Sequence, residues 1–180
     1  GNAPQGSHKV VTDVQGNYYT TGTFTGSITV GNTTLTSSGN RDAFLVKYNN
    51  CGVVQWAIKG GSTGEQDYPY SMAVDASGNV YWVGRYNQTF TINGTAGSFT
   101  SPYTSTSNGN HQDGFLVKLN ANGGVVWGAS CRGTSNDGFN GIALDNSGNP
   151  IVTGGFNGCC PSSFAVTIYG PNGNVGISSF

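Results

Sequence analysis

Charged side chains are scarce in this chain of 180 residues. They make up 8% of the sequence, and the formal net charge at pH 7 is -1. An ordinary globular domain carries about a quarter charged residues. The chain has no basic field that would attract nucleic acid, and it has no acidic tail. We therefore expect no nucleic-acid partner, and solubility must come from Gly, Asn, Ser and Thr.

Helix-forming residues are also rare, because the chain holds one Glu (Glu65) and few Leu or Ala. Thr, Val, Tyr and Phe are plentiful instead, and these residues favour strands. The aromatic content of 12% argues against disorder. No segment approaches the ~20 consecutive apolar residues of a membrane-spanning helix. These features predict an all-β protein without a membrane span.

The strongest positive signal is an internal repeat. The phrase DVQGNYYTTG begins at Asp13, DASGNVYWVG at Asp75 and DNSGNPIVTG at Asp145, so all three share the skeleton D-x-x-G-N-x-x-x-x-G. A second phrase follows each time, as AFLVKYNNCGVVQW from Ala43, GFLVKLNANGGVVW from Gly114 and a weaker copy from Ser163. Two phrases that recur in one order predict three tandem repeats in a single repeat domain, at about 8–69, 70–138 and 139–180.

Each repeat is predicted to hold four short antiparallel strands. Strand one is Val10–Thr12, Met72–Val74 and Ile142–Leu144; strand two is Tyr18–Thr21, Val80–Val83 and Ile151–Thr153; strand three is Phe44–Tyr48, Phe115–Leu119 and Phe164–Ile168; strand four is Val53–Ile58, Val125–Ala129 and Val175–Ser178. The connection between strands two and three varies in length, and in the first repeat it is itself strand-like. Such sheets bury both faces only between neighbours, which is typical of β-propeller blades.

The D-x-x-G-N segments between strands one and two are predicted to be tight turns. Asp can bond to its own backbone there, and Gly supplies a positive φ. The structural turn residues are Asp13, Gly16, Asn17, Asp75, Gly78, Asn79, Asp145, Gly148 and Asn149. Calcium binding is the alternative reading, since oxygen-rich loops suit that ion. The turn reading is favoured because the segment lacks several carboxylates.

Three phrases resemble a known family. TGTFTGSITVGNTTLTS (Thr21–Ser37), DAFLVKY (Asp42–Tyr48) and DASGNVY (Asp75–Tyr81) are similar to the bacterial SBBP-type β-propeller repeats. The resemblance covers nearly the whole chain, but the third repeat departs from it: Thr167 stands where the others have Lys, and strand four has no Trp. The resemblance implies a propeller-like fold and an extracellular or cell-surface location. It implies no defined activity.

Three blades are fewer than the four or more of a typical closed propeller. A whole number of repeats leaves edge strands that can recruit other strands. Two chains could form a six-bladed ring, many chains could join head to tail in a filament, or the chain could belong to a longer array. A fragment or a compact three-blade unit is the remaining reading. We expect self-association, with the filament slightly favoured.

No catalytic, cofactor-binding or metal-binding residue stands out. His8 and His111 occupy unrelated places in the repeat, and G-x-S-x-G, H-E-x-x-H and P-loop motifs are missing from the sequence. Asp42 and Asp113 precede strands that carry Lys47 and Lys118, which suggests repeat packing or surface ion pairs. An enzyme is therefore not expected.

Several residues remain candidates for other roles. Trp56 and Trp127 are equivalent and are expected in the core. Trp82 and Arg85, with Tyr81 and Tyr103, form a candidate sugar-binding patch, against the simpler reading that Trp82 packs between blades. The cysteines are Cys51, Cys131, Cys159 and Cys160, and we expect Cys131 to pair with Cys159 or Cys160, leaving two that could pair within the chain or between subunits. Asn32, Asn87 and Asn93 begin glycosylation sequons.

The sequence thus favours a secreted, non-catalytic structural subunit of an extracellular filament or surface assembly. The alternative is an adhesin or lectin-like module that binds carbohydrate or protein through its variable loops.

Overall fold

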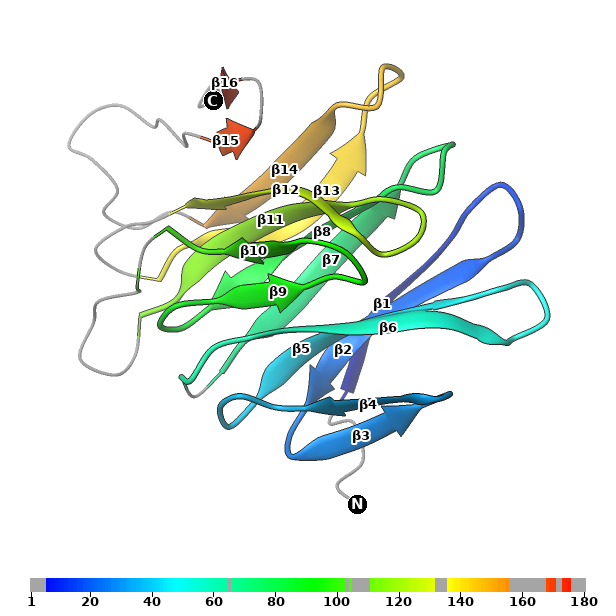
Figure 1. Cartoon of the computed structure of the whole chain (residues 1–180). Helices are drawn as coiled ribbons and strands as arrows, with labels where there is room; N and C mark the ends of the chain where they lie inside the picture. Colours follow the sequence, from blue (N-terminus) through cyan, green and yellow to red (C-terminus); the bar gives the residue numbers. More distant parts are fainter. Residues whose placement is uncertain are drawn as a thin grey trace.

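The computed structural model describes residues 6–64, 66–102, 104, 111–131, 136–155, 168–170 and 173–175. Within this part of the chain there is no helix, and every pair of neighbouring strands is antiparallel (Figure 1). The all-β prediction is therefore confirmed. No helix in these ranges is long and apolar enough to cross a membrane.

The first repeat contains β1 (Gly6–Thr12), β2 (Tyr18–Phe24), β5 (Asp42–Tyr48) and β6 (Val54–Gly61), which pair in this order. A separate hairpin, β3 (Ser27–Val30) with β4 (Thr33–Thr36), forms the connection between β2 and β5. This agrees with the strand-like connection expected there.

The second repeat contains β7 (Tyr68–Val74), β8 (Val80–Tyr86), β11 (Asp113–Leu119) and β12 (Val125–Cys131), in a four-stranded sheet. Its connecting hairpin, β9 (Thr91–Asn93) with β10 (Ser98–Thr100), pairs instead with β6 of the first repeat. The first sheet therefore has six strands, and the prediction that each repeat forms a sheet of only four strands was wrong for it.

The third repeat is described in less detail. β13 (Gly138–Leu144) pairs with β14 (Pro150–Gly155), and β15 (Ile168–Gly170) pairs with β16 (Gly173–Val175). Most of its predicted strands three and four, 164–168 and 175–178, lies outside the described residues.

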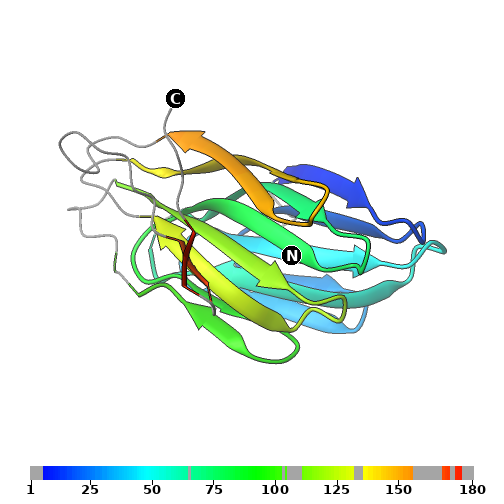
Figure 2. The same cartoon turned by 90° about the horizontal axis from the view of Figure 1, so that it is seen from above.

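The repeats lie against one another as successive layers. In Figure 1 the turns after β1, β7 and β13 line up along one side of the molecule, with the third repeat above the second and the second above the first, and in Figure 2, seen from above, the three repeats overlap. The first strands β1, β7 and β13 are neighbours in this order. The described strands do not close into a ring, so a propeller stays a prediction.

Apolar clusters fill the spaces between layers. The largest lies between the first and second repeats and includes Tyr19, Trp56, Met72, Trp82 and Phe115. A second cluster joins the second and third repeats, and a third lies between the first sheet and the β3–β4 hairpin. Two of the three clusters thus lie between repeats, and the third lies within the first repeat.

Candidate interface between repeats

The D-x-x-G-N segment forms the same hydrogen-bonded turn in all three repeats. In the second repeat the Asp75 carboxylate accepts the backbone N–H groups of Ser77 and Asn79 over 2.9 Å, and the Asn79 side-chain amide over 2.8 Å. Gly78 has a φ of 78°, which L-residues with a side chain rarely adopt. The Asp13 and Asp145 turns repeat these bonds. The carboxylates are therefore occupied by their own turns.

The last Gly of the skeleton has a different role. A Cβ on Gly84 would overlap the carbonyl oxygen of Tyr68 and the ring of Phe115. Gly22 and Gly154 face the carbonyl groups of Gly6 and Gly138 in the same way. Each of these contacts lies beside a bulge in strand one, which bends that strand toward its neighbour.

A second family of turns joins strands three and four, where the sequence predicts a turn rich in Gly and Asn. The Asn49 side-chain oxygen accepts the N–H groups of Cys51 and Val53, as Asp does in the first family. Asn120 makes the same bonds to Asn122 and Gly124. The signal was present in the sequence as N-x-x-G.

Two side chains of the first repeat donate to the Asn120 turn of the second. Trp56 donates its indole N–H to the carbonyl oxygen of Ala121 over 3.1 Å, and the Lys47 ammonium donates to the same oxygen over 3.0 Å. Lys47 also lies 5.2 Å from the centroid of the Tyr19 ring. We call Tyr19, Lys47 and Trp56 the Tyr–Lys–Trp cluster. It covers the side of the first repeat that faces the second.

The second repeat carries an equivalent cluster. Lys118 lies over the Tyr81 ring at 4.8 Å, and Tyr81 packs edge-on against Trp127. The Tyr81 hydroxyl donates to the carbonyl oxygen of Gly148, in the turn of the third repeat, over 3.2 Å. Lys, Tyr and Trp thus recur in the first two repeats, and the bonds that Lys47, Trp56 and Tyr81 make to the next repeat all end on backbone carbonyl oxygens.

The surroundings of the Tyr19 hydroxyl favour its protonated form, and those of the Asp13 and Asp145 carboxyls favour the ionised form. Burial, together with the negative charge of Asp13, raises the pKa of the Tyr19 hydroxyl, so Tyr19 remains a donor to Asp13 over 3.1 Å. Desolvation acts to raise the pKa of Asp13, but the bonds from Asn17, Tyr19 and Gln15 outweigh it and lower the pKa. The Asn149 side chain, with the backbone of its turn, lowers the pKa of Asp145.

Buried carboxylates lie at the opposite ends of the strands. Asp42 is fully buried and bonds to Lys59 over 3.2 Å, so of the two interpretations offered for it, repeat packing or a surface ion pair, the surface ion pair is wrong. Asp67, also fully buried, accepts bonds from the backbone N–H groups of Ser62 and Asn87. Burial raises the pKa of Asp67 to about 7. Sequence reasoning did not single out Asp67, because Asp is seldom fully buried.

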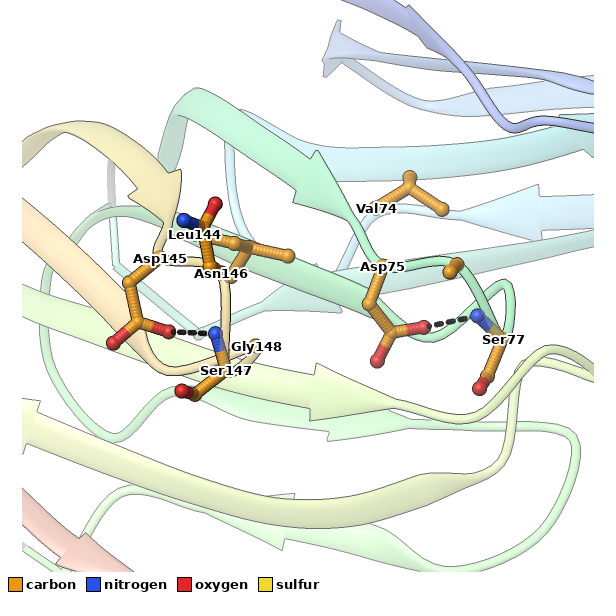
Figure 3. A pocket seen from close by; sticks show the side chains of 9 residues that line it. Val74, Asp75, Ser77, Leu144, Asp145, Asn146, Ser147 and Gly148 are labelled. Atoms are coloured by element: carbon orange, nitrogen blue, oxygen red, sulfur yellow. Dashed lines mark hydrogen bonds between the residues drawn. The ribbon is translucent and has the colours of Figure 1, made fainter.

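A groove separates the Asp75 turn from the Asp145 turn, with a volume of about 430 Å³ (Figure 3). Its walls are Val74–Ser77 and Leu144–Gly148, and in Figure 3 each aspartate is bonded to its own turn. In the ranges that the structure describes, no three His, Cys, Asp or Glu side chains gather as a metal site would require.

The sugar-binding patch is not assembled at the surface. Trp82 is fully buried and donates its indole N–H to Thr21 of the first repeat over 2.9 Å, so it cannot stack on a sugar. Arg85 bonds to Asn140 of the third repeat and lies over the Tyr70 ring. These residues join repeats, and Tyr103 lies outside the described residues.

The other candidates have varied surroundings. Cys51 is exposed in its turn, Cys131 is buried at the end of β12, and Cys159 and Cys160 lie outside the described residues, so their pairing stays a prediction. Asn32 and Asn93 are exposed. Asn87 is partly buried, and its side-chain amide donates to the carbonyl oxygen of His111 over 2.8 Å, which disfavours glycosylation there. His8 is exposed beside Tyr68.

Comparison with protein-family models gives no match, and comparison with curated protein sequences gives none either.

Proposed function

We propose that this chain is a non-catalytic, extracellular structural protein that self-associates head to tail into a filament or surface assembly. One observation carries the proposal: positions that are buried between repeats inside the chain are exposed at its two end faces. Met72, which faces the first repeat, is 2% exposed, whereas the equivalent Val10 is 60% exposed. Tyr81, which faces the third repeat, is 3% exposed, whereas the equivalent Ile151 is 57% exposed.

The two end faces are different surfaces. Val10 lies on the side of the first repeat that a preceding repeat would cover, and Ile151 lies on the side of the third repeat that a following repeat would cover. A contact between different surfaces is heterologous and produces rings or open filaments. The few charges of the chain offer little repulsion between copies.

The test uses one charge at each end face. Val10→Asp and Ile151→Asp should each stop assembly, because a charge buried at an apolar contact is costly. Both positions are exposed, so the folded state should be retained. Equal amounts of the two variants should form pairs and nothing larger, because each keeps one intact end face. Sedimentation velocity and negative-stain microscopy over a wide concentration range measure this.

Val126→Asp is the matched control, since Val126 is 48% exposed but lies in strand four of the second repeat, away from both end faces. It should assemble like the unmodified chain. A monodisperse monomer of the unmodified chain at all concentrations would reject the proposal. Pairs formed by Val10→Asp alone would reject the head-to-tail arrangement.

A further inference from the structure

We propose that the outer edge of β3 is the docking site for the third-repeat end of a second copy of this chain, which adds a strand there by main-chain pairing. This inference rests on the proposed function and specifies where two copies of the chain touch in the assembly. The two connecting hairpins, β3–β4 and β9–β10, are equivalent.

The hairpins match residue by residue. The Ser37 N–H donates to the Gly26 carbonyl, and the Ser101 N–H donates to the Phe90 carbonyl. The same serine hydroxyls accept the N–H groups of Gly26 and Phe90. From these anchors, Ile28 opposite Leu35 corresponds to Ile92 opposite Phe99. β3 is thus the first-repeat counterpart of β9.

Inside the chain, β9 is paired on both sides. Thr91 and Asn93 lie opposite Gly61 and Lys59 of β6, the last strand of the preceding repeat. In an antiparallel ladder the backbone groups of alternate residues point to opposite sides. Because Gly26 and Ile28 bond toward β4, the backbone groups of Ser27 and Thr29 point away from it. Among the described residues, β3 pairs with β4 alone.

Among the described residues, one equivalent edge is covered: β6 of the first repeat pairs with β9 of the second. The strand that covers it therefore comes from the preceding repeat. Under the proposed head-to-tail association, the third repeat of a second copy takes the place of that preceding repeat. The third repeat has Ile151 in place of Tyr, Thr167 in place of Lys and no strand-four Trp, and therefore lacks all three residues of the Tyr–Lys–Trp cluster. Pairing between backbone groups does not depend on these side chains, so the third repeat can still form it with β3 of another copy.

The experiment removes one outward N–H. Thr29→Pro deletes a donor on the free side of β3, and Thr34→Pro deletes one on the opposite side of the hairpin. The two variants are matched, because the Thr29 and Thr34 hydroxyls bond to each other over 3.1 Å and either change breaks that bond. We expect Thr29→Pro to lower assembly at least tenfold in the concentration required, and Thr34→Pro to leave it unchanged.

Amide hydrogen exchange of the unmodified chain provides a second measurement that needs no variant. The Ser27 and Thr29 amides should exchange freely in dilute monomer and become protected on assembly. If Thr29→Pro assembles like the unmodified chain, the docking site is wrong while head-to-tail association stands. If the unmodified chain never assembles, or if both amides are already protected in the monomer, a second copy is not the occupant.

Discussion

Trp56 and Ala121 join the first repeat to the second through an indole N–H and a backbone carbonyl oxygen 3.1 Å apart. The acceptor belongs to the main chain, so the residue type at position 121 is free to vary. The residues at the equivalent positions Asn50 and Ala121 accordingly differ between the first two repeats.

Removing this donor should weaken the interface modestly. Trp56→Phe keeps an aromatic ring but deletes the N–H, and Lys47 still donates to the same oxygen. We expect a loss of about 1 kcal/mol in the free energy of unfolding. Urea denaturation followed by circular dichroism measures it, with Val126→Thr as an exposed control expected to change little. An unchanged midpoint in Trp56→Phe would show that the bond contributes nothing.

The two glycines of the repeat skeleton should respond differently to Ala. At Gly148 nothing lies within 4 Å of the added Cβ, so only its φ of 78° opposes the change, at about 1–2 kcal/mol. At Gly84 the added Cβ would overlap Tyr68 and Phe115, so we expect a loss above ~3 kcal/mol or failure to fold. Thermal melts of both variants compare the two costs. Equal losses would contradict the bulge explanation.

Asp67 should make the chain less stable as the pH rises from about 4 to about 7. Burial raises its folded pKa to about 7, from 3.8 for an exposed carboxyl. Between these values the folded state binds a proton that the unfolded state has lost, so the free energy of unfolding falls, by on the order of 3–4 kcal/mol. Urea titrations at several pH values measure the slope.

The variant Asp67→Asn should flatten this slope whatever its own stability, because no titrating group remains at that site. The lowered pKa values of Asp13 and Asp145 act in the opposite direction, but at pH below about 4. A slope that persists between pH 4 and 7 in the variant would assign the effect to another group.

Cys51 should be alkylated before Cys131 in the native protein, because Cys51 is exposed and Cys131 is 5% exposed. Brief treatment with a maleimide, then denaturation and peptide mass spectrometry, measures the two sites separately. Cys51→Ala removes the fast site and provides the control. Faster labelling of Cys131 would mean that β12 opens readily at its end.

The sequence predicted the tight turns well, because all their bonds lie within five consecutive residues. Strand ends were harder to predict. β7 begins at Tyr68, whereas the prediction began at Met72, because the bulge between Pro69 and Ser71 interrupts the alternation of inward and outward side chains. Alternation beyond such a bulge no longer reports which face a residue occupies.

Contacts between repeats could not be predicted from local pattern. Trp82 lies in an alternating run that gives no sign of its bond to Thr21, 61 residues away. β9 is three residues long in a segment rich in Ser and Thr, so it was expected as a surface connection. Its strand character comes from pairing with β6, which is a tertiary effect.

The pairing of β9 with β6 means that the sheet of one repeat is finished by sequence belonging to the next. Insertion or deletion of a repeat must therefore begin and end at equivalent positions, or one sheet loses the hairpin that pairs with its last strand. Such a chain can be lengthened only by whole repeats in one orientation.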